Sequence, residues 1–269
     1  MIRFHIVTIF PEAVRPYMDA SILGRAQEAK HISVSYHDPR QNAKNKWGKV
    51  DDRPYAGGPG MVMTAEPLLR TLEKISKSIA KRKATKTKVI LFAPGGKQFT
   101  NVHAKALVAK YTDIILISGR YEGIDARVKK IFKAEEVSVG PFVLTGGEVP
   151  AMVVVDACAR QIEGVLGKHE SLEEERTASP EVYTRPEVIE WKGKKYRVPK
   201  VLLGGDHKKI EEWRVSVQEK SQKSTKGLLL SDKKLKELLA ISAEMDADVK
   251  NQKAFTNAND LIRDLKLLE

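Results

Sequence analysis

Three segments of this 269-residue chain place glycine directly after an apolar, β-branched run. They read FAPGG, ISGRYEGID and VSVGPFVLTGGEVPA, and they begin at Phe92, Ile117 and Val137. Ligands of open α/β sheets bind at the carboxyl ends of the strands, and glycine there lets backbone groups approach a ligand closely. The three loops therefore predict one shared pocket. The alternative interpretation is three tight turns that bind nothing.

The elements that must position these loops alternate along the first part of the chain. Apolar runs predict strands at 3–10, 32–38, 88–94, 113–119 and 135–140. Helical spacing lies between them, at 11–30, from about 66, at 102–110 and at 150–161. Strands that alternate with helices predict an α/β fold with a mostly parallel sheet over residues 1–162.

The second part of the chain has a different character. Residues 163–182 begin with an acidic, loop-like stretch and are expected to form a flexible linker. Beyond it, IEEWRVSVQEK and DKKLKELLAISAEM carry apolar residues at helical spacing. Residues 183–269 are therefore expected to form a small helical domain.

The charge distribution indicates a polyanionic partner. The net charge is +12, and residues 192–236 alone hold 14 Lys or Arg against 5 Asp or Glu. Clustered cations gain affinity for nucleic acid by releasing counterions from phosphates. A solvated, solubilising surface is the alternative.

Several classes of protein are disfavoured. No apolar stretch approaches the roughly 20 residues that span a bilayer, which predicts a cytoplasmic protein without membrane association. The six histidines have no metal-like spacing, so no metal site is expected. The single cysteine, Cys158, is expected to pack in the core.

Six segments together resemble the bacterial tRNA (guanine-N1)-methyltransferase family. They are VDDRPYAGGPGMVM, ISGRYEGIDARV, SVGPFVLTGGEVPAM, GVLGKHES, YTRPEV and VLLGGDHKKIEEWR, in this order over roughly residues 1–215. The resemblance implies a SPOUT-type α/β domain with a deep trefoil knot, a flexible linker and a helical tRNA-binding domain. It also implies a homodimer whose active sites are shared between subunits, and methylation of the guanosine 3′ of the anticodon, at position 37.

The resemblance further implies S-adenosylmethionine as the methyl donor, held by the knot loops; magnesium is a further possibility from the family alone. Leu91 and Ala93 stand where the family often has tyrosine and serine, and Pro141 and Phe142 replace a common Asp-Tyr pair. Backbone contacts would tolerate such changes. The implied cofactor-binding residues are Leu91, Phe92, Ala93, Pro94, Gly119, Tyr121, Glu122, Gly123, Val139, Gly140, Pro141, Phe142, Val143, Leu144, Gly146 and Gly147.

The chemistry of this reaction requires a base and a cation. Guanine N1 carries a proton that must leave, and negative charge then develops on O6, which a guanidinium can stabilise. Matching the motifs assigns the cation to Arg160. Ungapped counting through GKHES assigns the base to Glu175, with Glu173, Glu174 and His169 as alternatives.

The segment VDDRPYAGGPGMVM and the basic domain are the candidate tRNA contacts. The resemblance places the segment near the active site, so Asp52, Arg53 and Tyr55 are expected to contact RNA. An Arg53 pair with Asp51 or Asp52 that only shapes the loop is the alternative. Within and beside the basic region, the candidates are Arg185, His207 and Arg214.

Two further functions stay open at this stage. Because the base region departs from the family pattern, a catalytically impaired RNA-binding protein of the same fold is the main alternative. A methyltransferase that acts on a small molecule is a weaker one, since the basic domain argues against it.

Overall fold

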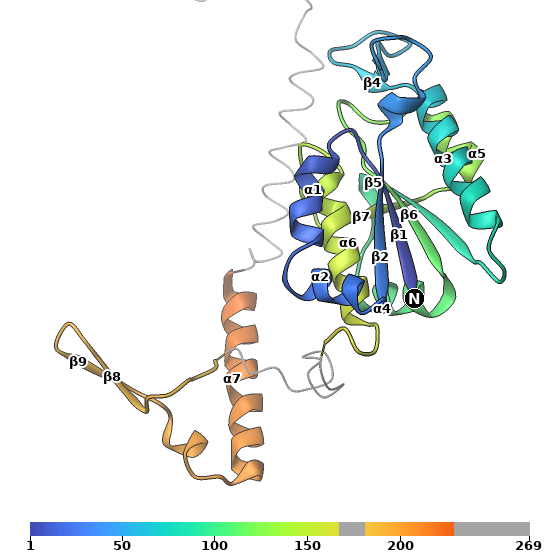
Figure 1. Cartoon of the computed structure of the whole chain (residues 1–269). Coiled ribbons are helices and arrows are strands. Elements are labelled where there is room, and N and C mark those ends of the chain that lie inside the picture. Colours follow the sequence, from blue (N-terminus) through green and yellow to red (C-terminus); the bar gives the residue numbers. More distant parts are fainter. Residues whose placement is uncertain (167–180, 229–269) are drawn as a thin grey trace, which may run out of the picture. The chain divides into compact units, whose positions relative to one another are not determined.

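The computed structural model describes residues 1–166 and 181–228, the side chains of residues 220–228 excepted. The chain divides into two compact units, Met1–Leu172 and Glu173–Glu269. Each unit has its own elements (Figure 1). The linker predicted at 163–182 falls largely on residues outside the described part, so the predicted domain boundaries stay a prediction.

A five-stranded sheet organises the first unit. Its order is β2-β1-β6-β5-β7, and every neighbouring pair is parallel. The α/β prediction with a mostly parallel sheet is confirmed. The trefoil knot stays a prediction. The strands are β1 (Ile2–Val7), β2 (Ile32–His37), β5 (Thr87–Gln98), β6 (Asp113–Ile117) and β7 (Glu135–Ser138).

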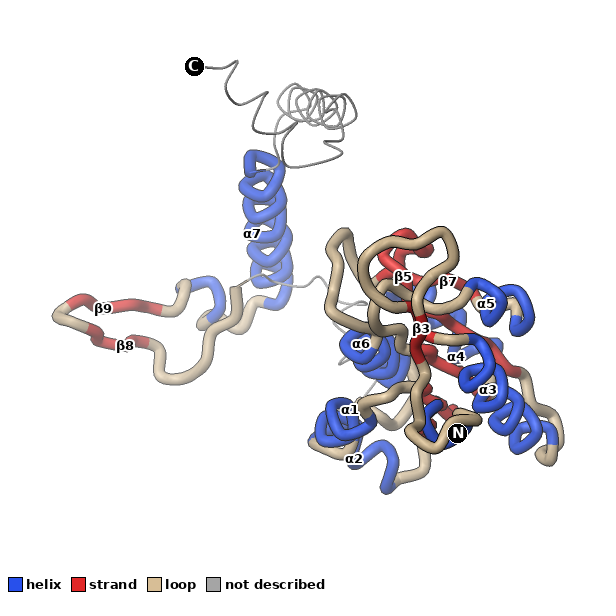
Figure 2. Tube along the Cα trace, turned by 90° about the horizontal axis from the view of Figure 1, so that it is seen from above, coloured by secondary structure: helices blue, strands red, loops and turns tan. Residues whose placement is uncertain are grey.

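Helices cover both faces of this sheet (Figure 2). One face packs against α1 (Pro11–Met18), α2 (Ser21–Glu28), α4 (Asn101–Lys110) and α6 (Glu148–Arg160). The other packs against α3 (Ala65–Ala80) and α5 (Ala126–Phe132). Because both faces are covered, β6 carries the continuous apolar run IILI after Asp113, and every one of its residues is buried.

The sequence pattern explains the main helix on the second face. In α3, Leu68, Leu72, Ile75 and Ile79 recur at helical spacing and are all buried. Cys158 lies on the opposite face in α6, where burial raises the pKa of its thiol to about 12. The predicted packing role of Cys158 is confirmed, because its side chain is fully buried in the apolar core on this face.

The helices of the first unit differ from the prediction in two places. The single helix expected over 11–30 is instead α1 and α2, with a break at Asp19 and Ala20. The break brings the Asp19 carbonyl against Gly24, where a β-carbon would overlap it. The second difference is α5, which was not predicted although Asp125 caps it by accepting a hydrogen bond from the Arg127 N–H at 2.9 Å.

Two short strands complete the first unit. β3 (Asp51–Asp52) and β4 (Val62–Met63) pair antiparallel and enclose the glycine-rich loop between them. No helix among the described residues is long and apolar enough to cross a membrane.

The second unit combines a hairpin with a long helix. β8 (Val188–Trp191) and β9 (Lys194–Arg197) form an antiparallel hairpin, followed by the 3₁₀ helix η4 (Lys200–Leu202) and by α7 (His207–Leu228). The helix agrees with the expected helical domain. The hairpin was not predicted. It forms because β-branched and aromatic residues flank a Lys192-Gly193 turn in which both residues have positive φ.

Candidate active site

A cavity of about 250 Å³ lies where the three glycine loops meet. It sits at the carboxyl ends of β6 and β7 and at an irregularity within β5, where both Phe92 and Lys97 pair with Val137. The prediction that the loops share one pocket is confirmed. The predicted cofactor residues that line it are Phe92, Ala93, Pro94, Gly119, Tyr121, Glu122, Gly123, Val139, Phe142, Val143, Leu144, Gly146 and Gly147.

Three of the residues predicted to bind the cofactor do not line the cavity. Leu91 is 8% exposed and packs in the core on the α3 face of the sheet. Gly140 lies beneath the Phe142 ring, which would overlap a β-carbon at that position. Pro141 is exposed on the same loop. Motif matching assigned whole loops, whereas strand alternation and local packing turn some of their residues away.

Close backbone approach explains the glycines of the third loop. The Gly147 N–H donates a hydrogen bond to the Gly119 carbonyl at 2.9 Å and so joins two of the loops. A β-carbon on Gly147 would lie 2.6 Å from the Ser118 Cα. Glycine is therefore required where the third loop meets the second.

The sequence reasoning missed a charged cluster beside the cavity. Arg120 lines the cavity, and its Nε lies 2.9 Å from Glu148 Oε2. The Glu148 carboxylate is buried and also accepts a hydrogen bond of 2.7 Å from the Thr8 hydroxyl. The Arg120 guanidinium in addition lies over the Phe10 ring, 4.7 Å from its centroid. These contacts fix Arg120 at the cavity wall.

The position of Glu148 explains why a carboxylate is tolerated in the core. It is the first residue of α6, where the helix dipole favours negative charge. Arg120 and Glu148 lie in the second and third glycine loops, and their opposite charges were the feature of the sequence from which this ion pair could have been predicted. The other lining residues that the prediction missed are Val137, Ser138, Thr145 and Pro150.

The loop between β3 and β4 is bound to the second cavity loop by backbone hydrogen bonds. The Glu122 N–H donates to the Met61 carbonyl at 2.9 Å, and the Met63 N–H donates to the Gly123 carbonyl at 2.9 Å. Gly60 lies against the Glu122 side chain, which leaves no room for a β-carbon. The segment VDDRPYAGGPGMVM therefore borders the cavity wall.

The tip of this loop presents polar side chains to solvent. Tyr55 is 98% exposed, and Asp52 accepts a hydrogen bond of 2.9 Å from the Arg53 N–H. Within the described part of the chain, the Arg53 guanidinium forms no ion pair with Asp51 or Asp52, so the loop-shaping alternative gains no support from its side chain. Asp52, Arg53 and Tyr55 line an open groove together with Asp125 and Arg127.

Arg160 lies away from the cavity of its own chain. It is the last residue of α6, whose first turn borders the cavity, and 13 helical residues extend about 18 Å. Arg160 instead ends a second, apolar groove on the outer face of α6. The other residues of this groove are Tyr17, Val149, Met152, Val153, Asp156 and Ala157.

The comparisons with known proteins agree with these motifs. The model of the family "tRNA (Guanine-1)-methyltransferase TrmD" matches residues 2–231. The chain belongs to this tRNA (guanine-1)-methyltransferase family.

Curated relatives match over most of their length. A tRNA (guanine-N(1)-)-methyltransferase of Clostridioides difficile is 44% identical over 79% of this chain and 90% of its own. The Buchnera aphidicola protein of the same name is 41% identical over 80% and 89%. That of Psychromonas ingrahamii is 39% identical over 90% and 98%.

The family match extends into the second unit as far as residue 231 and so includes its predicted tRNA-binding residues. Arg185 and His207 are exposed, whereas Arg214 is partly buried and lies 3.4 Å from Glu211. His207 is the first residue of α7. The base candidates Glu175, Glu173, Glu174 and His169 lie outside the described residues.

Proposed function

We propose that this protein transfers the methyl group of S-adenosylmethionine to N1 of the guanosine 3′ of the anticodon, position 37 of tRNA. The observation that carries the proposal is the cavity shared by three glycine loops in a chain of this methyltransferase family. The basic second unit supports tRNA as the substrate, because its cations can neutralise phosphates. Such a substrate implies a cytoplasmic enzyme.

The cavity residues suit a nucleoside-like donor. Phe92, Val139 and Leu144 give it apolar walls, and the glycines expose backbone groups that can bind polar atoms. Two charged side chains line it, Arg120 and Glu122, and Arg120 is neutralised by Glu148. The donor, when bound, supplies a methyl group activated by a positively charged sulfur.

The protein's own residues must then prepare the acceptor. We assign removal of the N1 proton to Glu175, because a carboxylate within hydrogen-bond reach can act as a general base. We assign Arg160 to the developing O6 charge, since a fixed guanidinium stabilises an oxyanion by charge-assisted hydrogen bonds. Glu173, Glu174 and His169 remain the alternative bases.

We propose that the active enzyme is a homodimer in which each cavity is completed by Arg160 of the partner subunit. The separation of Arg160 from the cavity of its own chain supports this arrangement. The outer face of α6 supports it too, since Val149 is 49% and Val153 41% exposed beside an apolar groove.

The dimer is tested by placing a charge on this face. Val153→Asp should give a monomer in sedimentation analysis and lose methyl transfer, whereas the wild type sediments as a dimer. A wild-type monomer with full activity would contradict the arrangement.

The reaction is tested by incubating the protein with S-adenosylmethionine and a tRNA transcript that has guanosine at position 37. Mapping the modified base should find 1-methylguanosine at position 37 and none in a transcript with adenosine there. Parallel reactions with and without Mg²⁺ test the metal dependence that the family resemblance implies. Methylation at another position, or none under either condition, would contradict the proposal.

The base is tested in the same assay by single substitutions. Glu175→Gln should slow single-turnover methyl transfer by about two to three orders of magnitude, which is within the usual contribution of a general base. Glu173→Gln and Glu174→Gln are the matched controls. A wild-type rate for Glu175→Gln would move the role to Glu173, Glu174 or His169.

A further inference from the structure

One face of the β8–β9 hairpin carries three large apolar side chains in solvent. Ile189 pairs with Tyr196, and Trp191 pairs with Lys194. Since side chains alternate along a strand, these four residues share one face. Ile189, Tyr196 and Trp191 are 52%, 57% and 65% exposed, so the described residues of this unit leave more than half of each side chain open. Three large, exposed apolar side chains within the ten residues of the hairpin mark an interaction surface.

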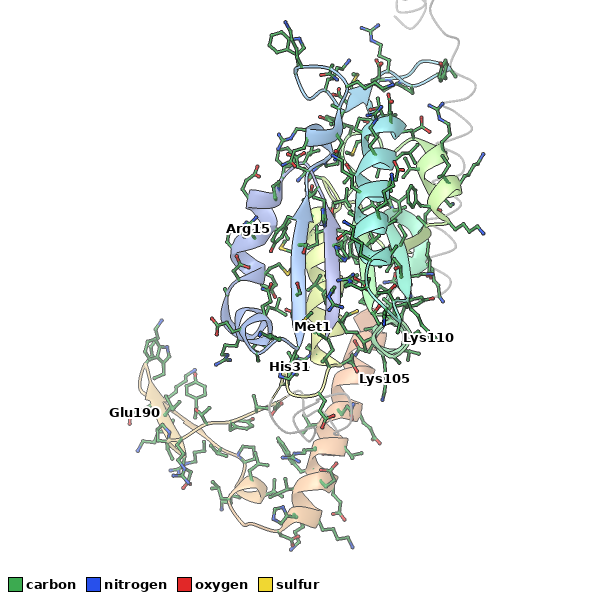
Figure 3. All side chains as sticks on the ribbon, turned by 45° about the vertical axis from the view of Figure 1, so that its right-hand side comes forward. Met1, Arg15, His31, Lys105, Lys110 and Glu190 are labelled. Atoms are coloured by element: carbon green, nitrogen blue, oxygen red, sulfur yellow. The ribbon has the colours of Figure 1, made fainter. Side chains whose placement is uncertain are left out.

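Cations lie beside these apolar side chains along the hairpin: Lys194 shares their face, whereas Lys195 and Arg197 lie on the other face. Residues 188–200 contain one acidic residue, Glu190, which Figure 3 labels on the hairpin. In the described ranges 1–166 and 181–228, no carboxylate lies within ion-pair distance of the basic residues of this segment. These basic residues are Lys192, Lys194, Lys195, Arg197 and Lys200.

The backbone of the hairpin holds the face in a defined geometry. Lys192 and Gly193 form a two-residue turn with φ of +50° and +74°, the conformation that matches the twist of paired strands. The Val198 N–H donates to the Glu187 carbonyl at 2.9 Å and extends the pairing by one step. The strand register that brings the aromatic side chains to one face is therefore set before any partner binds.

We propose that this face is a stacking platform for unpaired bases of the tRNA substrate, with Lys194 and the other cations of the hairpin on the adjacent phosphates. Aromatic side chains in a basic groove bind single-stranded nucleic acid by stacking, and RNA loops offer unstacked bases. Lysine is depleted from the cores of protein–protein interfaces, so its density here favours RNA over a protein partner. The inference rests on the proposed function and deepens it.

Two alanine variants test the platform in the full chain. Trp191→Ala and Tyr196→Ala should each raise the dissociation constant for tRNA by about 5- to 100-fold, the range measured for loss of one stacked base. The KM for tRNA should rise by a similar factor and kcat should change less. Trp191→Phe, which keeps a ring, should recover most of the affinity. Val182→Ala, an 85% exposed control in the same unit, should bind like the wild type.

Tryptophan fluorescence gives an independent measurement. The chain has three tryptophans, so Trp47→Phe and Trp213→Phe together leave Trp191 as the reporter. Its emission should be quenched on addition of tRNA, because a stacked base quenches an indole, and it should recover at high salt as the phosphate contacts weaken.

The outcomes separate this inference from the proposed function. A wild type that methylates position 37 while both alanine variants bind tRNA within twofold of it would overturn the platform alone. A melting temperature lowered by several degrees, or an altered sedimentation coefficient, in Trp191→Ala would also overturn it, because the face would then pack on this chain or on a second copy. A wild type that binds no tRNA would overturn both.

Discussion

At the scale of single residues, Arg160 is the clearest test of the chemistry. Arg160→Ala should lower the rate of single-turnover methyl transfer by about two to three orders of magnitude, as loss of one oxyanion donor typically does. The affinity for S-adenosylmethionine should stay within a few-fold, because Arg160 is assigned to the guanine O6 and not to the cofactor.

The matched control for Arg160 is Arg70→Ala. Arg70 is a surface arginine of α3 that pairs with Glu66 one helical turn away, at 3.0 Å. Its loss should leave methyl transfer unchanged. If Arg160→Ala reacts as fast as Arg70→Ala, stabilisation of the O6 charge belongs to another residue.

A second residue-scale prediction concerns Gly146. A β-carbon there would overlap the Arg120 side chain and lie 2.7 Å from Glu148 Oε2. Gly146→Ala should therefore displace the guanidinium at the cavity wall and weaken S-adenosylmethionine binding by about tenfold or more, as measured by calorimetry. Gly95→Ala is the control, because nothing lies within 4 Å of its new methyl group. If the two variants bind S-adenosylmethionine with equal affinity, the assignment of this cavity as the S-adenosylmethionine site is wrong.

At the scale of elements, β1, β2 and β6 share a buried polar cluster on the α3 face. His5 Nε2 lies 3.1 Å from Asp113 Oδ1, and His5 Nδ1 lies 3.3 Å from His37 Nε2. Asp113 also pairs with Arg82 and accepts a hydrogen bond from Thr112. Burial lowers the pKa of His37 to about 4, and burial also lowers the pKa of His5.

Because of this cluster, we expect the free energy of unfolding to decrease in mild acid. Below pH 6.5 the unfolded chain protonates His37, whereas the folded chain does so only near pH 4. The contribution of neutral His37 to the free energy of unfolding is therefore fully present above pH 6.5 and is lost as the pH falls toward 4. Between pH 7.5 and 5 the free energy of unfolding should fall by about 1 to 2 kcal/mol from this residue.

Urea unfolding at the two pH values measures this effect. His37→Gln should lose less stability on acidification than the wild type, whereas His207→Gln, at an exposed position, should lose as much. An identical pH dependence in His37→Gln would show that acid destabilisation arises elsewhere.

At the scale of the whole molecule, we expect the first unit to bind S-adenosylmethionine and the second unit to bind tRNA. Truncation after Gly167 removes the basic region at 192–236 but keeps the sheet, both of its packed faces and the cavity. The truncated protein should bind S-adenosylmethionine with affinity within a few-fold of the full chain. Its tRNA affinity should fall by about 100-fold or more, with a shallower dependence on salt. An unchanged affinity and salt slope would contradict the division.

The sequence alone determined the strands of the main sheet, most of its helices and the location of the cavity. Continuous apolar runs such as IILI specify strands buried on both faces, and glycine after three of these runs marked the loops that line one pocket. These features depend on neighbours in the sequence, so local patterns reveal them. Long motifs added the family, because many residues in fixed order leave little room for coincidence.

Only the tertiary structure decided which residues of those loops face the cavity and which charges meet there. Thr8, Arg120 and Glu148 come from three segments that the sheet brings together, and no local pattern links them. The same reason applies to Arg160, whose separation from its own cavity follows from the length and direction of α6. The exposed face of the β8–β9 hairpin likewise appeared only with the strand register, because pairing determines which side chains share a face.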